Sequence, residues 1–217
     1  QSLHEAMDAC LKRGEQMMLF LNRRGYAGFV SCRSCGYVAE CPNCNISLTY
    51  HKYENNLQCH YCGYTIGNYK ECPVCHSPYI RYFGGGTQKV EEELTKLFPL
   101  ATVIRMDIDT TGRKQGHEKI LERFEKEKIH ILIGTQMVSK GLDFDNVTLV
   151  GVITADTMLH INDFRSAERT FSMLEQVCGR AGRGSKDGRA VIQTYNPDNT
   201  AISSGNQEKI KFHITRN

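Results

Sequence analysis

Apolar residues recur along this chain in two patterns, one typical of buried strands and one typical of amphipathic helices. Residues 131–133 and 147–153 form short apolar runs that are rich in β-branched side chains. Such runs are typical of strands that are buried on both faces of a parallel sheet. We expect further strands at residues 17–21, 102–106 and 190–194, with the last of these closing the sheet.

Between these strands, apolar side chains recur at the three- and four-residue spacing of helices that bury one face. The sequence predicts helices over residues 2–13, 87–98, 118–128 and a segment before residue 176. Strands that alternate with helices indicate an α/β fold, with a parallel sheet flanked by helices. The side chains expected on the buried helix faces are Leu3, Met7, Cys10 and Leu11; Val90, Leu94, Leu97 and Phe98; Leu121 and Phe124; and Ala167, Phe171 and Leu174.

Residues 31–79 break this pattern, because they form short polar segments punctuated by cysteines and contain no long apolar period. A segment of this size and composition cannot bury enough apolar surface to fold unaided. The strand pattern returns at residues 80–83. We therefore interpret residues 31–79 as an insertion into the α/β domain that metal ions hold together.

Composition is that of an ordinary globular protein, with 217 residues, 40% hydrophobic and 24% charged, which allows one sizeable core and a small satellite domain. A net charge of +3 is too mild to indicate nucleic-acid binding by itself. The chain has neither a run of 18 apolar residues nor a signal-peptide pattern at its start, so we expect a cytosolic protein.

Eight of the ten cysteines form four Cys-x-x-Cys pairs, the spacing of metal-binding knuckles. Four thiolates suit tetrahedral Zn²⁺, so we expect two structural zinc ions, with iron–sulfur ligation as the alternative. A predicted hairpin joins the second and third pairs, which leaves the first and fourth for the other site. A cross-braced pairing, first with third and second with fourth, stays open. The expected ligands are Cys32, Cys35, Cys72 and Cys75 in site 1 and Cys41, Cys44, Cys59 and Cys62 in site 2.

Two polar blocks near the buried strands carry ligand-binding chemistry. The first, GTQMVSKGLDF at residues 134–144, directly follows a strand, where the ligands of parallel sheets gather. The second, QVCGRAGR at residues 176–183, places Arg180 and Arg183 three residues apart among glycines, so both guanidiniums can reach one phosphate. Taken alone, a solvated loop and a basic, glycine-rich helix end are the ordinary explanations. The glycine run at residues 84–86 lacks the spacing of a phosphate loop.

These two blocks resemble motifs V and VI of superfamily 2 helicases. With FLNRRGYAGFVSCRSCG, the four knuckles, GGGTQKVEEEL and DFRSAERTF, they are similar to the second helicase lobe of the PriA family (primosomal protein N′), the bacterial replication restart helicases. The resemblance covers about residues 19–197. It implies a RecA-like lobe of an enzyme that uses ATP and Mg²⁺ to unwind DNA 3′ to 5′ at stalled or abandoned replication forks, in the bacterial cytoplasm.

The resemblance also implies roles for individual residues. Arg183 and Arg180 would face the γ-phosphate of ATP, with Arg183 as the arginine finger, and Gln176 would help to position the nucleotide. Gly141 and Asp143 would link the ATP cleft to the DNA track. The residues implied to contact the DNA backbone are Thr135, Gln136, Arg23 and Thr87.

The implied partners are forked DNA and single-strand/duplex junctions, primosome proteins, single-stranded DNA-binding protein and a first helicase lobe, with no membrane. Because the chain opens at Gln1 and has no phosphate-loop lysine or Asp-Glu pair for magnesium, we expect a piece of a longer protein that does not hydrolyse ATP alone. The expected divisions are residues 1–30 and 80–197 for the helicase lobe, 31–79 for the insertion, and 198–217 for a linker or the start of a C-terminal region.

A competing interpretation is a zinc-dependent module that binds DNA or protein on a passive α/β platform. Residues 134–183 discriminate between the two, since a passive platform has no use for two spaced arginines that face a cleft. A closer rival is another superfamily 2 helicase, such as a branch-migration enzyme. Such an enzyme would not require the eight-cysteine insertion.

Overall fold

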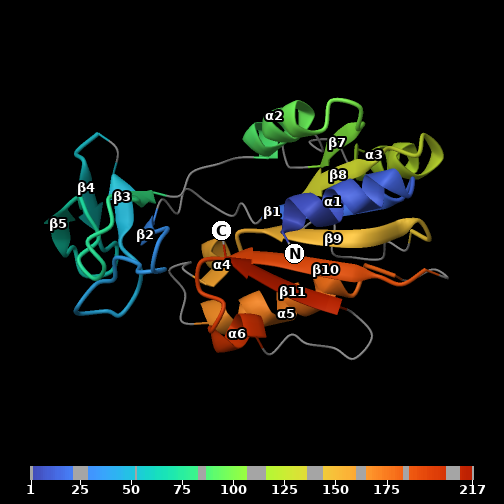
Figure 1. Cartoon of the computed structure of the whole chain (residues 1–217). Coiled ribbons are helices and arrows are strands. Elements are labelled where there is room, and N and C mark those ends of the chain that lie inside the picture. Colours follow the sequence, from blue (N-terminus) through green and yellow to red (C-terminus); the bar gives the residue numbers. More distant parts are fainter. Residues whose placement is uncertain are drawn as a thin grey trace.

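The computed structural model describes residues 2–21, 29–51, 53–82, 87–106, 116–135, 144–159, 165–182, 186–203 and 211–216. Its largest element is a six-stranded sheet in the order β11-β10-β9-β1-β8-β7, in which every neighbouring pair is parallel. Helices lie on both faces of this sheet (Figure 1). The predicted parallel sheet flanked by helices is therefore confirmed. Its strands are Gln16–Leu21 (β1), Val103–Met106 (β7), Ile131–Gly134 (β8), Val147–Ile153 (β9), Arg189–Thr194 (β10) and Lys211–Arg216 (β11).

Strand β1 lies inside the sheet, between β8 and β9, and all six of its residues are buried. Side chains alternate across a strand, so Met17 and Leu19 join the core on one face while Met18 and Phe20 join the core on the other. Both faces of the strand are buried, which explains why its sequence is a continuous apolar run and does not alternate between apolar and polar residues.

One face of the sheet is covered by α1 (Leu3–Lys12) and α2 (Thr87–Leu97). Helix α1 begins with a capping box: the Glu5 N–H donates to Ser2 Oγ at 3.3 Å, and the Ser2 N–H donates to Glu5 Oε2 at 3.2 Å. These bonds satisfy amides that the first turn would otherwise leave without partners. The helix then buries an apolar stripe that includes Leu3, Met7 and Cys10, as the spacing predicts.

The other core contains side chains from α3 (Gly116–Lys126), α4 (Asp156–Leu159), α5 (Ser166–Cys178) and α6 (Thr200–Ser203). Phe124 of α3 is fully buried and packs edge-on against Phe144, with ring centroids 5.2 Å apart. Helix α5 buries Leu174 and Val177.

The cysteine-rich insertion stands to one side of the main sheet (Figure 1). Strands β2 (Val30–Cys32) and β6 (Ile80–Tyr82) pair antiparallel at its base. A three-stranded antiparallel sheet follows, made of β3 (Thr49–His51), β4 (Asn56–Gln58) and β5 (Thr65–Gly67). Its core is small and includes four of the cysteines: the buried residues are Val30, Cys32, Ala39, Cys41, Leu48, Leu57, Cys59, Cys72 and Ile80.

The strand predicted at residues 80–83 forms but lies outside the main sheet, and one prediction for the main sheet itself is wrong. The apolar signal at residues 80–83 belongs to β6, which pairs with β2 in the insertion. Arg81 is exposed and separates the apolar residues Ile80 and Tyr82. This alternation of apolar and polar residues is typical of an antiparallel strand with one face in solvent. Strand β10 does not close the sheet, because β11 pairs with it in parallel.

Two helix residues expected in the core are exposed. Leu97 is 56% exposed because it lies off the stripe formed by Val90 and Leu94 of α2 and by Phe98 directly after it. Ala167 lies near the start of α5 and is also exposed. The buried stripes of these helices are therefore narrower than expected.

Candidate functional site

The four Cys-x-x-Cys pairs fold into four copies of one turn. In each copy, the N–H after the second cysteine donates to the carbonyl oxygen of the first cysteine at 2.9–3.0 Å. The N–H of the first cysteine donates to the carbonyl oxygen two residues beyond the second at 2.8–2.9 Å. The turn places the residue after the second cysteine in the left-handed region: φ is 78° at Gly36, 52° at Asn45, 76° at Gly63 and 55° at His76.

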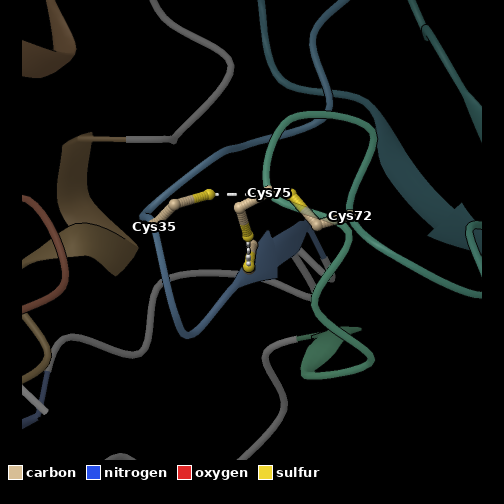
Figure 2. A group of neighbouring side chains, drawn as sticks. Cys35, Cys72 and Cys75 are labelled. Carbon is tan, nitrogen blue, oxygen red and sulfur yellow. Dashed lines mark hydrogen bonds between the residues drawn. The ribbon is translucent and has the colours of Figure 1, made fainter.

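The eight cysteines gather into two groups of four, and within each group the sulfur atoms lie within 4.8 Å of one another. Figure 2 shows Cys35, Cys72 and Cys75 of the first group turned toward a common centre. The first pair lies with the fourth and the second with the third, which is the nested arrangement and not the cross-braced one. The groups are Cys32, Cys35, Cys72 and Cys75, and Cys41, Cys44, Cys59 and Cys62.

The spacing of the sulfur atoms suits a tetrahedral metal ion. The distance is 3.6 Å from Cys32 to Cys75 and from Cys35 to Cys72, and 3.5 Å from Cys41 to Cys62. Zinc–sulfur bonds of about 2.3 Å with tetrahedral angles would place the sulfur atoms about 3.8 Å apart. Each group can therefore hold a metal ion after a small outward movement of its thiolates.

The electrostatics of the second group also favour a cation. The backbone N–H of Tyr64 lowers the pKa of Cys62 to about 6, because it donates a hydrogen bond to the thiolate. The Cys62 thiol in turn raises the pKa of Cys44 to about 12. Adjacent thiolates repel one another, so full ionisation of the group requires a neutralising ion.

The insertion touches the main domain at its first knuckle. A Cβ atom added to Gly36 would lie 3.0 Å from the carbonyl oxygen of Tyr195, which directly follows β10. The buried carboxylate of Asp156 accepts the Tyr195 N–H at 3.1 and 3.2 Å and the hydroxyl of Thr194 at 3.0 Å. Burial raises the pKa of Asp156. Sequence reasoning missed this anchor, for which the only signal is an acidic residue soon after a buried strand.

Helix α5 brings the arginine block to the amino-terminal edge of the sheet. Gly179 caps the helix, and the Gly182 N–H donates at 3.2 Å to the carbonyl oxygen of Val147, the first residue of β9. Gln176 is exposed on the last turn, and Arg180 is half-buried just beyond it. Arg183 lies outside the described residues.

The GTQMVSKGLDF block begins at the opposite, carboxyl-terminal edge. Thr135 directly follows β8 and is 9% exposed, so its side chain is largely covered. Thr87 is the first residue of α2 and is 1% exposed. The two polar blocks thus start from opposite ends of the parallel strands. The other predicted residues of this group lie outside the described part of the chain: Gln136, Gly141, Asp143 and Arg23.

A polar cluster near the arginine block was also missed by sequence reasoning. Glu15 is 7% exposed, and its Oε2 accepts from Thr148 Oγ1 at 2.6 Å and from Arg13 Nε at 2.7 Å. Lys186 Nζ lies 3.8 Å from Glu15 Oε1. Burial raises the pKa of Glu15, but the hydrogen bonds from Thr148 and Arg13 and the nearby cations outweigh it and hold this pKa below its usual value. The only signal for this cluster in the sequence is a polar residue before an apolar strand.

Two family models match the chain. Residues 41–66 match the PriA DNA helicase Cys-rich region domain, and residues 78–185 match the helicase conserved C-terminal domain. None of the helices in the described ranges is both long and apolar enough to cross a membrane.

Known proteins resemble this chain along most of its length. Replication restart protein PriA of Bacillus subtilis is 60% identical over 200 residues, which is 92% of this chain and 25% of that protein. The protein of the same name from Synechocystis is 50% identical over 208 residues, covering 94% of this chain and 25% of that protein. Among solved structures, the chain is similar to Mss116p DEAD-box helicase domain 2 bound to an RNA duplex. The two are 12% identical with a TM-score of 0.47, and the match covers 97% of this chain and 58% of that one. Over the part that it spans, this chain belongs to the PriA family and combines the Cys-rich region of that family with a helicase C-terminal domain.

Proposed function

We propose that this chain is the second lobe of an ATP-dependent 3′-to-5′ DNA helicase that binds stalled or abandoned replication forks and initiates primosome assembly. The chain spans about a quarter of the length of the curated relatives it matches. In this proposal the ATP-binding first lobe belongs to the rest of a longer protein. The observation that supports it best is the placement of two polar blocks at opposite edges of one parallel sheet.

At the amino-terminal edge, the arginine block serves the nucleotide. Arg183 and Arg180 face the γ-phosphate of ATP, which the first lobe holds together with Mg²⁺, and Gln176 helps to orient it. Negative charge grows on the phosphoryl oxygens in the transition state, and a guanidinium placed there stabilises that charge more than it stabilises the bound substrate. An arginine finger of this kind contributes about 10³- to 10⁵-fold to the rate. The position of α5, which ends beside the first residue of β9, supports this role.

At the carboxyl-terminal edge, the second block serves DNA. Thr135 and Gln136, with Arg23 and Thr87, contact the sugar–phosphate backbone, where hydroxyl, amide and guanidinium groups set register without reading sequence. Gly141 and Asp143 connect this track to the ATP cleft. The location of Thr135 directly after β8 supports a ligand site at this edge. For Thr87, a contact with DNA requires the start of α2 to open, since the side chain is 1% exposed.

The two cysteine groups hold two structural Zn²⁺ ions. Bound zinc supplies cross-links between the four knuckles and no redox chemistry. This role fits the small core of the insertion, in which four of the nine buried residues are cysteines. The insertion then offers a rigid surface beside the main sheet for forked DNA or for protein partners.

The proposal also includes three further partners and a place of action. They are primosome proteins, single-stranded DNA-binding protein and the first helicase lobe, and the place of action is the bacterial cytoplasm, where the chromosome lies. We divide the chain into lobe residues 1–30 and 80–197, the insertion 31–79, and a linker or C-terminal start at 198–217. A passive binding platform would leave the arginine block at the amino-terminal edge without a purpose.

Substitution Arg183→Ala in the whole protein tests the nucleotide role. We expect DNA-stimulated ATP turnover to fall about 10³-fold or more, because the transition state loses its finger. The melting temperature and DNA affinity should stay unchanged. The matched control is Arg123→Ala on α3, an exposed arginine paired with Glu127 at 3.0 Å, which should leave turnover unchanged. Near-normal turnover of the Arg183→Ala protein would overturn the proposal.

A further inference from the structure

The first knuckle of the insertion rests against the main domain through its backbone. The Gly36 N–H donates to the carbonyl oxygen of Cys32 at 3.0 Å, so the knuckle turn sets the position of Gly36. A Cβ atom added to Gly36 would lie 3.0 Å from the carbonyl oxygen of Tyr195 and 3.8 Å from the Cβ atom of Asn196. The contact is therefore too close for a side chain to fit between the two backbones without movement.

On the main domain, hydrogen bonds hold the other half of this contact. Asp156 is 4% exposed, and its two carboxylate oxygens accept the Tyr195 N–H at 3.1 and 3.2 Å. Its Oδ1 also accepts from the hydroxyl of Thr194, the last residue of β10, at 3.0 Å. The Asn196 N–H donates to Thr194 Oγ1 at 3.0 Å. Tyr195 is thus fixed to the end of β10.

In the insertion, metal site 1 shapes the knuckle that carries Gly36, because its four cysteines join the first knuckle to the fourth. Cys32 is the last residue of β2 and pairs with Ile80, the first residue of β6. Ser34 Oγ and Ser77 Oγ are 2.7 Å apart in an exposed hydrogen bond between the same two knuckles. An exposed hydrogen bond adds little net stability, since water competes for both groups. Bound metal is therefore the main tie between these two knuckles.

Metal site 2 belongs to a different part of the insertion. Its cysteines lie on either side of the hairpin formed by β3 and β4, in a three-stranded sheet that Figure 1 shows on the outer side of the insertion. Gly63 holds the place in the third knuckle that Gly36 holds in the first, and its φ is 76° against 78°. A Cβ atom added to Gly63 would meet nothing within 4 Å. The same turn is thus in contact with the main domain at site 1 and open at site 2.

We propose that the two metal sites have different roles. Metal in site 1 seats the insertion on the main domain through the contact between Gly36 and Tyr195, whereas metal in site 2 stabilises the outer sheet. The inference rests on the part of the proposed function that assigns Zn²⁺ to both cysteine groups, and it does not require helicase activity. Loss of the first ion then releases the insertion from the end of β10, and loss of the second ion does not.

The first experiment measures the placement of the insertion in the zinc-loaded whole protein by single-molecule energy transfer. Donor and acceptor dyes are attached through unnatural amino acids at Val74 in the fourth knuckle and at Leu100 after α2, which are 63% and 94% exposed. The cysteines then stay unlabelled. We expect one narrow distribution of transfer efficiency that shifts and broadens with Cys35→Ser and keeps its mean and width with Cys62→Ser. Mass spectrometry should find one zinc ion in each of these two variants.

A second pair of variants disturbs the contact without removing a metal ligand. Gly36→Asn places a side chain against Tyr195, while Gly63→Asn is the matched control, because asparagine tolerates positive φ at both positions. Both variants should keep two zinc ions per chain. We expect Gly36→Asn to shift and broaden the distribution as Cys35→Ser does, and Gly63→Asn to leave it unchanged.

The same measurements can contradict the proposal. Equal broadening by Cys35→Ser and Cys62→Ser would show that the two sites act alike, and an unchanged distribution in Gly36→Asn would show that the contact with Tyr195 does not seat the insertion. Either result overturns the inference and leaves the zinc assignment standing, provided that the unmodified protein holds two ions. Fewer than two ions in the unmodified protein would overturn that assignment and the inference together.

Discussion

Among single residues, the same backbone conformation recurs at four places in the insertion with three different residue types. Gly36, Asn45, Gly63 and His76 all follow the second cysteine of a knuckle and all have positive φ. Asparagine and histidine both adopt the left-handed region more often than most residues with a side chain. The knuckle turn alone therefore does not require glycine. At Gly36 a second constraint applies, because Tyr195 lies directly against it.

Asparagine substitutions at the two glycines separate these constraints. A Cβ atom at Gly63 would meet nothing within 4 Å, whereas one at Gly36 would lie 3.0 Å from the Tyr195 carbonyl oxygen. We expect Gly63→Asn to lower the free energy of unfolding by less than about 1 kcal/mol and Gly36→Asn to lower it by about 1 to 3 kcal/mol, as overpacking does. Urea unfolding of the zinc-loaded chain, followed by circular dichroism, measures both. Equal losses would show that the contact between the first knuckle and Tyr195 contributes nothing to stability.

Among the strands and helices, the insertion and the main sheet are stabilised by different means. Every strand of the insertion is three residues long, whereas β9 has seven residues and is buried for six of them. A two-stranded sheet is marginal in water, and a three-stranded sheet needs a hydrophobic face or further packing to be stable. Structural zinc contributes about 10 to 16 kcal/mol of folding free energy in small modules. The insertion should therefore depend on metal and the main sheet should not.

Single cysteine variants test this dependence. We expect Cys35→Ser and Cys62→Ser each to reduce bound zinc from two ions per chain to one, because each removes one of four thiolates. Cys178 lies in α5, and burial raises its pKa to about 12, so Cys178→Ala should keep both ions. Metal content by mass spectrometry and cleavage within residues 33–79 by limited proteolysis are the measurements. A chelator should expose the same region to protease while the core of the main sheet stays protected.

Proteolytic resistance of the insertion after complete metal removal would contradict this account. Loss of both ions in the Cys178→Ala variant would contradict it in another way, since no thiol outside the two groups is expected to bind metal.

The same elements show what could be predicted from the sequence. Strands β1, β8 and β9 were predictable because their apolar runs are local signals, and the cysteine spacing gave the nested groups through a local hairpin. Strand β11 was missed because its residues do not form an apolar run. It is a strand because it pairs with β10, and that pairing leaves no local pattern in the sequence. The Glu15–Thr148 contact joins residues far apart in the chain, so no local pattern reports it.

In the whole molecule, the described parts of the two polar blocks lie at opposite edges of the sheet. The arginine block lies beside the start of β9, while Thr135 follows the end of β8. In the proposed function, a nucleotide at one edge is coupled to a DNA strand at the other, and a second lobe completes both sites.

The purified chain alone should therefore show no DNA-stimulated ATP turnover. Its arginines can stabilise charge only on a nucleotide that other groups hold in place, and the sequence contains no phosphate-loop lysine and no Asp-Glu pair for Mg²⁺. The measurement is phosphate release with and without forked DNA, on a zinc-loaded and folded sample, beside the whole protein at the same concentration. The Arg183→Ala variant of the chain controls for a contaminating ATPase, which would be unaffected by that change. Turnover that DNA stimulates and that Arg183→Ala removes would mean that one lobe suffices, and the two-lobe account would be wrong.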